Sequence, residues 1–351
     1  MATKIKAFFE KVGSFFKNLP SNIKKGSKAF AQGVRDIPKA FHDDYGNFTI
    51  NKVKGWIYLA PALVLLIVFT FYPLVNTVFL SFWNGYKVSL HTAGNMPLSI
   101  GFQNYIKVFE NASLGQGLKN TVVLAVITVP LSTLIALLIA VGLNSIKPLR
   151  KILQTIFLLP YVTNSIAIGM VFAMIFNVVE GGGVVNDPGL FNRLLGLFGI
   201  DMKYWISTGA PWINKIFVMS VYIIWNALPF KILILLGALQ SVNKQYYDAA
   251  KVDGSSRLTI FTKITVPLIS PMLFYVIVTG FIGAFKEYSS VVGIFGEKLG
   301  VYGMSTMVGF IYDSLDGMWT GRAAAGAIIL FLIIMVVTGI QFIVSKKRVH
   351  Y

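Results

Sequence analysis

Long uninterrupted runs of apolar residues, and not alternating apolar and polar positions, dominate the chain from Trp56 onward. Six such runs occur, at approximately 56–82, 120–143, 152–176, 213–239, 268–294 and 324–345. A helix needs about 20 predominantly apolar residues to cross the hydrocarbon core of a bilayer, which is about 30 Å thick. The pattern therefore predicts an all-α polytopic membrane protein with six transmembrane helices.

The composition of the 351-residue chain agrees with this class, because 55% of its residues are hydrophobic and only 13% are charged. Soluble domains carry about 25% charged residues. The chain contains no cysteine, which excludes disulfides and thiolate metal sites, and its three histidines are scattered without metal-ligand spacing. We therefore expect this chain to bind no metal and no other cofactor.

The formal net charge of +17 comes largely from Lys and Arg residues that cluster beside the apolar runs. This location favours contact with membrane lipid and argues against nucleic acid as a partner. With the N-terminus in the cytoplasm, the N-terminal tail and the segments 144–151, 240–267 and 346–351 hold 21 of the 31 Lys and Arg residues. Since positive residues concentrate in cytoplasmic loops, these segments and both termini are predicted to be cytoplasmic.

Three regions are predicted: a basic cytoplasmic extension over 1–55, a six-helix transmembrane domain over 56–345 and a short cytoplasmic tail over 346–351. The extension holds eleven Lys or Arg against four Asp or Glu, and its apolar residues between Ile5 and Leu19 recur at helical spacing. Two interpretations stay open. In the first, the extension forms a short helix lying in the lipid interface. In the second, it is a disordered tail that touches lipid through charge alone.

The inner loop over 240–271 is long enough to hold structure of its own. The sequence predicts a helical turn starting at Asp248, because an acidic residue favours a helix N-terminus, and a sharp turn at Gly254. A second helical stretch is predicted to reach Ile264, with Pro267 at the entry of the next membrane helix. Composition alone favours an ordinary amphipathic loop, whereas the spacing of particular residues points to a function.

That spacing resembles the EAA signature of permease subunits of bacterial binding-protein-dependent ABC importers, of the maltose and multiple-sugar type. The matching positions are Asp248, Ala249, Ala250, Gly254, Ile264 and Pro267. Asp248 replaces the usual Glu and Val266 replaces the usual Leu, so the acidic side chain is one methylene shorter. The resemblance extends over nearly all of 56–345, and it implies that the loop forms a coupling helix that docks into a cleft of an ATPase.

The chain contains no phosphate-binding loop of the form G-x-x-x-x-G-K-[ST], so ATP would be hydrolysed by another protein. The resemblance implies two partner ATPase subunits that use ATP and Mg, a second permease subunit forming a heterodimer, and an extracellular solute-binding protein. It also implies a location in the bacterial plasma (inner) membrane. We predict a transport subunit that is not itself an enzyme.

Polar and aromatic residues within the apolar runs are candidates to line the solute pathway. They are Tyr222, Trp225, Asn226, Phe230, Lys231 and Glu287. A charged side chain deep in a bilayer costs about 2.5–3.5 kcal/mol on insertion scales, which makes Lys231 and Glu287 notable. Lys231 either lines a watery pathway or reaches toward the inner headgroups. Glu287 either contacts the solute or a partner subunit, or stands at the interface if the fifth helix ends near Phe285.

The aromatic candidates suit a sugar, whose rings offer apolar faces beside many hydroxyls, but they equally suit ordinary packing. The resemblance implies that the helices before and after the 240–271 loop line the solute site. The sequence therefore predicts a permease for a di- or oligosaccharide. One alternative is a permease for a phosphorylated polyol, phosphate or polyamine, in which Lys231 would meet phosphate. Another is an ion-gradient-driven secondary transporter that uses Lys231 and Glu287 as titrating groups.

Overall fold

The computed structural model describes residues 48–88, 99–146, 152, 155, 156, 161, 163–181 and 184–346. Most of the predicted extension, residues 1–47, and the end of the predicted tail lie outside the described residues. The chain divides into two compact units, one ending at Pro73 and the other beginning at Leu74. Each unit is described by itself below.

The first unit contains α3 (Phe48–Leu66), followed by a π-helical turn over Ile67–Phe71. The wider turn lies just before Pro73, which has no N–H to give to a helical carbonyl, so the hydrogen-bond ladder changes there. The apolar side chains over 56–73 are exposed, apart from the half-buried Leu63. Such a face is unfavourable in water and suits a lipid environment, as the first apolar run predicts.

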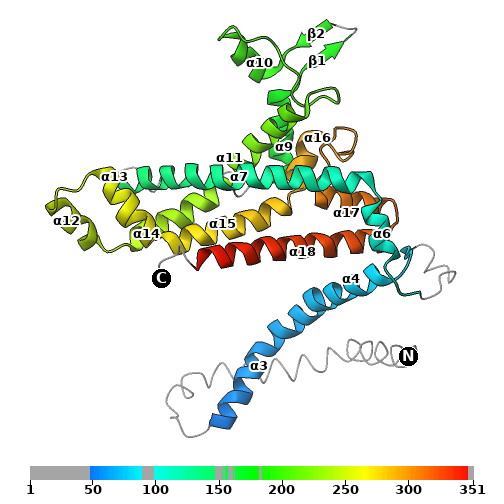
Figure 1. The fold of residues 1–351 in the computed structure, drawn as a ribbon, viewed down its shortest axis with the longest axis horizontal. Helices are drawn as coiled ribbons and strands as arrows, with labels where there is room; N and C mark the ends of the chain where they lie inside the picture. The colour runs from blue at the N-terminus through cyan, green and yellow to red at the C-terminus, as the bar shows by residue number, and fades with distance from the viewer. Residues whose placement is uncertain are drawn as a thin grey trace. The chain divides into compact units, whose positions relative to one another are not determined.

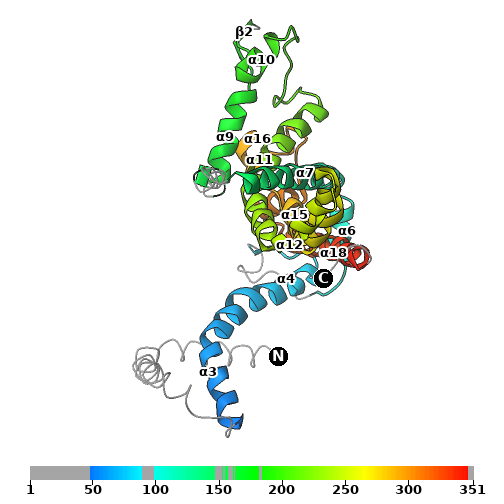
Figure 2. The same cartoon turned by 90° about the vertical axis from the view of Figure 1, so that its left-hand side faces the viewer.

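The second unit is a helical bundle with a small outer hairpin (Figures 1 and 2). After α4 (Tyr72–Phe82), which spans the boundary between the units, its helices and the second π-turn (η2) are α6 (Gln103–Phe109), α7 (Ala112–Ser145), α9 (Ser165–Phe176), α10 (Gly189–Gly196), α11 (Trp212–Ser241), α12 (Lys244–Val252), α13 (Arg257–Ile260), η2 (Phe261–Thr265), α14 (Val266–Leu268), α15 (Ser270–Phe285), α16 (Ser289–Phe295), α17 (Met307–Asp316) and α18 (Thr320–Ser345).

The long helices α7 and α11 pack closely against each other. Their contact includes the small residues Ala136 and Ala140 of α7, which meet Leu235 and Leu239 of α11 in one buried cluster. Small residues let two membrane helices approach closely, which strengthens van der Waals packing where no hydrophobic effect acts between helices. Helix α15 packs against both, so the three helices form the framework of the site described below.

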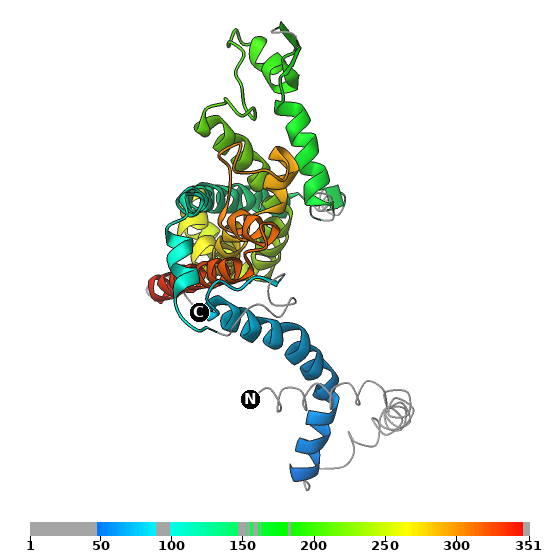
Figure 3. The same cartoon turned by 90° about the vertical axis from the view of Figure 1, so that its right-hand side faces the viewer.

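A second close contact joins α9 and α16 through two glycines. A Cβ atom placed on Gly169 would lie 2.7 Å from the Cα of Gly293, and one placed on Gly293 would lie 2.7 Å from the carbonyl oxygen of Ile166. Backbone therefore meets backbone at this crossing, and neither position has room for a side chain. Figure 3 shows α9 leading from this crossing toward α10 and the strands.

The C-terminal end of α9 continues into two short antiparallel strands, β1 (Val179–Gly181) and β2 (Val184–Asp187), and then α10. The all-α prediction is therefore correct except for this hairpin. Asn192 of α10 fixes the loop that follows, because its amide donates to the Lys203 carbonyl at 2.9 Å and accepts from the Trp205 indole at 3.0 Å.

Four helical spans in the described part of the chain are long and apolar enough to cross a membrane. They are Gly55–Phe82, Ala112–Ser145, Trp212–Ser241 and Thr320–Ser345. The segments Arg257–Leu268 and Ser270–Phe285 pass the same test together, with a bend of 68° between them, and would make a fifth span. The predicted third segment, 152–176, contributes the twelve-residue α9 and otherwise lies largely outside the described residues. Six transmembrane helices remain a prediction.

Candidate functional site

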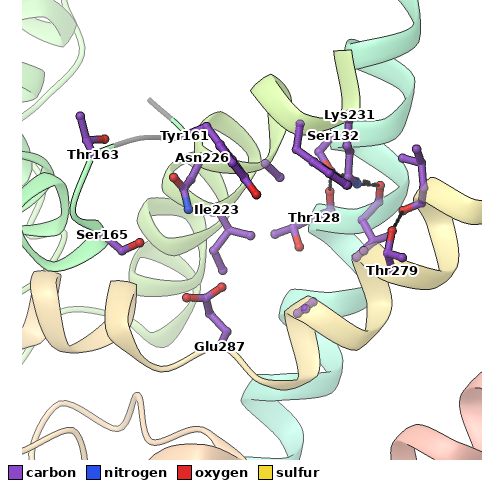
Figure 4. Close-up of a pocket in the computed structure, with 17 residues that line it drawn as sticks. Thr128, Ser132, Tyr161, Thr163, Ser165, Ile223, Asn226, Lys231, Thr279 and Glu287 are labelled. Atoms are coloured by element: carbon purple, nitrogen blue, oxygen red, sulfur yellow. Dashed lines mark hydrogen bonds between the residues drawn. The ribbon is translucent and has the colours of Figure 1, made fainter. Parts of the chain in front are cut away.

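A cavity of about 360 Å³ lies in the second unit among α7, α11, α15 and the start of α9 (Figure 4). Its lining combines hydroxyl, amide, charged and aromatic side chains with small apolar residues. The polar and aromatic members are Thr128, Ser132, Tyr161, Thr163, Ser165, Asn226, Phe230, Lys231, Thr279 and Glu287. Apolar walls with a few convergent polar groups are typical of small-molecule sites.

Lys231 is only 4% exposed, and its ammonium turns toward α7. Its Nζ donates to the Ser132 hydroxyl at 2.7 Å, the Thr133 hydroxyl at 2.9 Å and the Val129 carbonyl at 3.2 Å. An ammonium has three N–H groups, so these bonds engage all of them. The side chain lines the cavity, and its ammonium is directed at α7.

Gly280 of α15 makes room for this arrangement. A Cβ atom at Gly280 would lie 3.0 Å from the Val129 side chain and 3.3 Å from the Lys231 Nζ. Both distances are tighter than ordinary van der Waals contact, so any side chain here would displace the lysine or α7. The glycine, which offers no hydrogen bond of its own, therefore contributes to the site by leaving space.

Glu287 lies just beyond the end of α15, which ends at Phe285 as one of the two sequence interpretations expected. Its side chain nevertheless lines the cavity, where its carboxylate accepts a hydrogen bond from the Ser290 hydroxyl. The Glu287 carbonyl accepts from the Thr306 hydroxyl at 2.9 Å, which ties this break between α15 and α16 to the start of α17. Among the described residues no ion pair joins Glu287 to Lys231.

The four aromatic and amide candidates of α11 divide into two pairs. Phe230 and Asn226 line the cavity, where the Phe230 ring stacks on Tyr161 with centroids 6.0 Å apart and planes 19° apart. Tyr222 and Trp225 instead pack against Phe172 of α9, with centroids 5.0 and 5.6 Å away. The Tyr222 hydroxyl also donates to the Ser165 carbonyl at 2.8 Å. This second pair holds α9 against α11.

The hydroxyl residues of α7 were not among the sequence candidates. Thr128 and Ser132 are one helical turn apart, so they share a face of α7, and both line the cavity. The Thr128 hydroxyl oxygen is buried and has no hydrogen-bond partner among the described residues. A stripe of hydroxyls at i and i+4 in an otherwise apolar run was the signal that could have identified them.

The 240–271 loop forms the predicted helix-turn-helix. Helix α12 begins at Lys244, capped by the Asn243 side chain, which accepts from the Gln245 N–H at 3.0 Å. The predicted helical start at Asp248 is therefore wrong, because Asn243 is the better N-cap and the helix starts beside it. Gly254 has a φ of +70°, as a tight left-handed turn requires. Ser256 then caps α13.

The remaining signature residues are spread over this loop. Ala250 is buried, while Ala249 and Asp248 are exposed, the latter in a surface ion pair with Lys251 at 3.6 Å. Ile264 lies in the π-helical turn, and Pro267 is the second residue of α14. As at the first π-turn, a proline follows two residues after the widened helix. The structure places these residues on one elbow and does not bring them to the cavity.

The same loop carries unusually exposed apolar side chains. Val252 is 88% exposed and Leu258 is 72% exposed, one on each side of the Gly254 turn, and Tyr246 is also exposed. These three apolar side chains are therefore available for contact with another surface. The Thr265 hydroxyl donates to the Tyr247 hydroxyl at 3.4 Å, which joins the two arms of the elbow.

The family described as binding-protein-dependent transport system inner membrane component matches residues 129–350. Curated relatives include the lactose transport system permease protein LacF of Rhizobium radiobacter, 28% identical over 302 residues, covering 84% of this chain and 95% of the relative. The arabinooligosaccharides transport system permease protein AraP of Halalkalibacterium halodurans is 29% identical, covering 83% and 87%. The probable ABC transporter permease protein YesP of Bacillus subtilis is 30% identical over 308 residues, covering 86% and 93%.

A similar fold occurs in a solved structure of a bacterial alginate ABC transporter in complex with an alginate pentasaccharide-bound periplasmic protein. The similarity has a TM-score of 0.68 at 21% sequence identity and covers 86% of this chain and 98% of the other. At this identity the likeness concerns the fold alone.

Proposed function

Because this chain belongs to the family of binding-protein-dependent transport system inner membrane components, we propose that it is the permease subunit of an ATP-driven importer for a di- or oligosaccharide. The family predicted from the loop spacing is thereby confirmed. Relatives named for lactose and for arabinooligosaccharides support a sugar as the solute.

The observation that carries the proposal is the direct connection between the cavity and the 240–271 loop. Helix α11, which supplies Asn226, Phe230 and Lys231 to the cavity, ends at Ser241, and α12 begins three residues later. On the other side of the loop, α14 leads through a bend at Ile269 into α15, which also lines the cavity. A displacement of α12 and α13 would therefore reach two walls of the cavity at once.

The proposed mechanism uses this connection. A solute-binding protein delivers the sugar from outside, and two ATPase subunits close on the cytoplasmic side while they hydrolyse ATP with Mg. Val252 and Leu258 offer the apolar surface on which an ATPase would hold the elbow. Closure moves the elbow and, through α11 and α15, reverses the side on which the cavity opens. A second permease subunit supplies the other half of the pathway, and this chain makes and breaks no covalent bond.

The cavity chemistry suits a sugar better than a phosphate-bearing solute. The stacked Tyr161 and Phe230 rings offer an apolar face, and Asn226 and Glu287 supply groups that hydrogen-bond to hydroxyls. The alternative phosphate site would need the Lys231 ammonium, whose three N–H groups are directed at α7. The orientation follows the charge count, with the 240–271 loop and both chain termini in the cytoplasm and the chain in the bacterial plasma membrane.

The test is to purify the full-length tagged chain with its co-purifying ATPase and binding protein, reconstitute them in proteoliposomes, and measure uptake of labelled oligosaccharides. We expect uptake that requires ATP and the ATPase. Gly254→Asp, which adds a charged side chain at the turn, should separate ATP hydrolysis from uptake or prevent assembly, whereas Lys251→Gln is the matched control. Gradient-driven uptake by the chain without an ATPase would contradict the proposal.

A further inference from the structure

Three cationic side chains converge on one indole ring in the second unit. The Lys87 Nζ lies 3.5 Å from the centroid of the Trp319 ring. The Lys107 Nζ lies 5.7 Å and the Arg322 guanidinium 5.5 Å from the same point. We refer to these three cations and the indole as the basic cluster. Like charges held close together repel one another, so their convergence is unfavourable unless a negative charge lies nearby.

The described residues supply no such negative charge. Neither of the two ion pairs among them involves the basic cluster. The ammonium groups of Lys87 and Lys107 make no hydrogen bond within the described part of the chain, and the indole N–H of Trp319 has no acceptor there. Arg322 uses its Nε to donate to the Ser314 hydroxyl at 3.2 Å, and its other N–H groups remain. The cluster therefore offers positive charge and several donors to a ligand with several acceptor oxygens, as a phosphate has.

Asn104 of α6 holds the elements of the basic cluster together. Its side chain is 2% exposed and donates to the Trp83 carbonyl at 2.7 Å, while the Gly85 N–H donates to its oxygen at 3.2 Å. A Cβ atom on Gly321 of α18 would lie 2.6 Å from the Asn104 amide nitrogen, so α18 approaches this side chain closely. The Gly321 N–H also donates to the Tyr86 carbonyl at 3.0 Å. The cations therefore stand on a framework of fixed geometry.

The basic cluster lies where the ends of three apolar spans meet. Helix α4 ends at Phe82, α7 begins at Ala112 and α18 begins at Thr320, and α6 contacts both α7 and α18 (Figure 1). All three helices belong to spans that are long and apolar enough to cross a membrane. Tryptophan and basic residues at such ends lie at the depth of the lipid headgroups. A ligand of the cluster is therefore met at the membrane surface.

Helix α6 adds an exposed apolar face beside the cluster. Phe102, Ile106 and Phe109 recur at helical spacing and are 68%, 55% and 68% exposed, whereas Val108 is buried against the bundle. Lys107 directly follows Ile106 and borders this face. A short helix with an apolar face and a basic border is suited to the boundary between acyl chains and headgroups.

We propose that the basic cluster binds the headgroup of an anionic phospholipid whose acyl chains lie along the exposed face of α6. The lipid phosphate meets the three cations and the indole N–H. A zwitterionic headgroup would bring a cation of its own into the cluster, so an anionic lipid is preferred. The inference needs only that the chain lies in a membrane, and it is independent of the transported solute.

The test measures which lipid lies beside α6, in the full-length chain with its co-purifying subunits in phosphatidylcholine nanodiscs. The chain has no cysteine, so Phe109→Cys carries a single fluorophore. Traces of spin-labelled phosphatidylglycerol or spin-labelled phosphatidylcholine quench it according to their local concentration. We expect phosphatidylglycerol to be enriched roughly tenfold over phosphatidylcholine at this position. The same fluorophore at Phe331→Cys, an exposed position in the middle of α18, should show no preference.

Two variants and a soluble competitor assign the enrichment to the cluster. Lys87→Gln combined with Lys107→Gln should reduce it to about twofold or less, because each cation near the surface contributes separately. Lys119→Gln is the matched control, since Lys119 lies over the ring of another tryptophan, Trp212, at 4.2 Å, and it should leave the enrichment unchanged. Glycerol phosphate, compared with chloride at equal ionic strength, should not displace the lipid, because it lacks acyl chains.

Equal quenching by the two lipids at position 109 would overturn the inference. So would an unchanged enrichment in the double variant or an equal loss in Lys119→Gln. Displacement by glycerol phosphate would overturn the assignment to a lipid and leave a site for a soluble phosphate. The assay measures lipid and not uptake, so its failure would leave the proposed transport function standing, and the reverse also holds.

Discussion

The cavity and the 240–271 loop differ in where their interactions are directed. In the cavity, Lys231 is held by groups on α7 that lie 98 to 102 positions away in the sequence. In the loop, helix α12 carries local side-chain bonds, the cap from Asn243 and the Asp248–Lys251 pair. Its apolar residues Val252 and Leu258 point outward.

This difference separates a region held by bonds between distant segments from one that exposes apolar side chains. Long-range bonds fix the distance between the helices around the cavity, so the solute site has a defined shape. The elbow keeps its own helix-turn-helix form through caps and a glycine turn, but its largest exposed apolar surface is uncovered. In the proposed mechanism, this exposed apolar tip receives the movement of another protein and passes it to the cavity.

The largest expected effect comes from filling the glycine crossing behind the cavity. Gly293→Leu would place side-chain atoms where the Ile166 carbonyl and Gly169 backbone lie within 3 Å, so we expect a loss of about 3 kcal/mol or more. The measurement is thermal unfolding in detergent, followed by size-exclusion profile. Gly254→Ala in the loop is the comparison, since a Cβ there meets open space and only the left-handed φ costs about 1–2 kcal/mol. Equal destabilisation by the two variants would contradict the view that the glycine crossing is tightly packed and the loop turn is not.

The next largest effect concerns transport without a change in folding. Leu258→Asp should reduce ATP-driven uptake by about a hundredfold, because a charge replaces an apolar contact at the partner surface. Its thermal stability should match that of the wild type, since the side chain is exposed. The control Lys251→Gln removes one member of an exposed ion pair and should change uptake less than twofold. If Leu258→Asp took up sugar at the wild-type rate, the loop would not couple the ATPase to transport.

A smaller effect is expected in the aromatic wall of the cavity. Phe230→Ala should raise the apparent KM for the sugar up to about tenfold, because the stacked pair with Tyr161 loses one face. Concentration-dependent uptake measures it. Trp225→Phe serves as the control, because Trp225 packs on Phe172 outside the cavity lining and should leave KM nearly unchanged. If Trp225→Phe raised the apparent KM more than Phe230→Ala did, the solute would lie on the α9 side of α11.

The smallest effect is expected at the helix cap of the loop. Asn243→Ala removes the acceptor for the Gln245 N–H and should weaken α12 by about 1 kcal/mol. Uptake should fall only two- to threefold, because a bound ATPase would restore the helix. Asn243→Asp keeps the acceptor and should retain uptake close to the wild-type rate. A complete loss of uptake in the alanine variant would mean that the elbow depends on this cap far more than its local bonds indicate.

Helices that follow from local pattern were predictable from the sequence. The run at 213–239 corresponds to α11, Trp212–Ser241. Few charged residues interrupt this apolar run, so the helix continues almost to the Asn243 cap of the next helix. The Gly254 turn was equally readable, since glycine adopts a positive φ without strain. The start of α12 was misplaced because an acidic residue was preferred to an asparagine cap that lies five positions earlier.

The cavity was less predictable because it depends on contacts between distant segments. Lys231 and Glu287 were identified as costly charges, but the sequence could not show that Ser132 and Thr133 would surround the lysine. The run at 268–294 left open whether the helix ends near Phe285, and the structure shows that it does, with the Glu287 carbonyl accepting from the Thr306 hydroxyl just beyond. The Thr306 contact beside this break joins segments 19 positions apart, which local propensity does not encode.

The absence of cysteine from the chain allows the central claim to be tested with single reporter thiols. Leu258→Cys places one at the exposed tip of the loop, and Phe198→Cys places one at an exposed position beyond α10, as the control for the opposite side. The measurement is labelling by a membrane-impermeant maleimide in intact cells and in inside-out vesicles, with and without the ATPase. We predict that the thiol at 258 is labelled only in inside-out vesicles and is protected when the ATPase binds. Labelling of that thiol from outside intact cells, or no protection by the ATPase, would contradict the account.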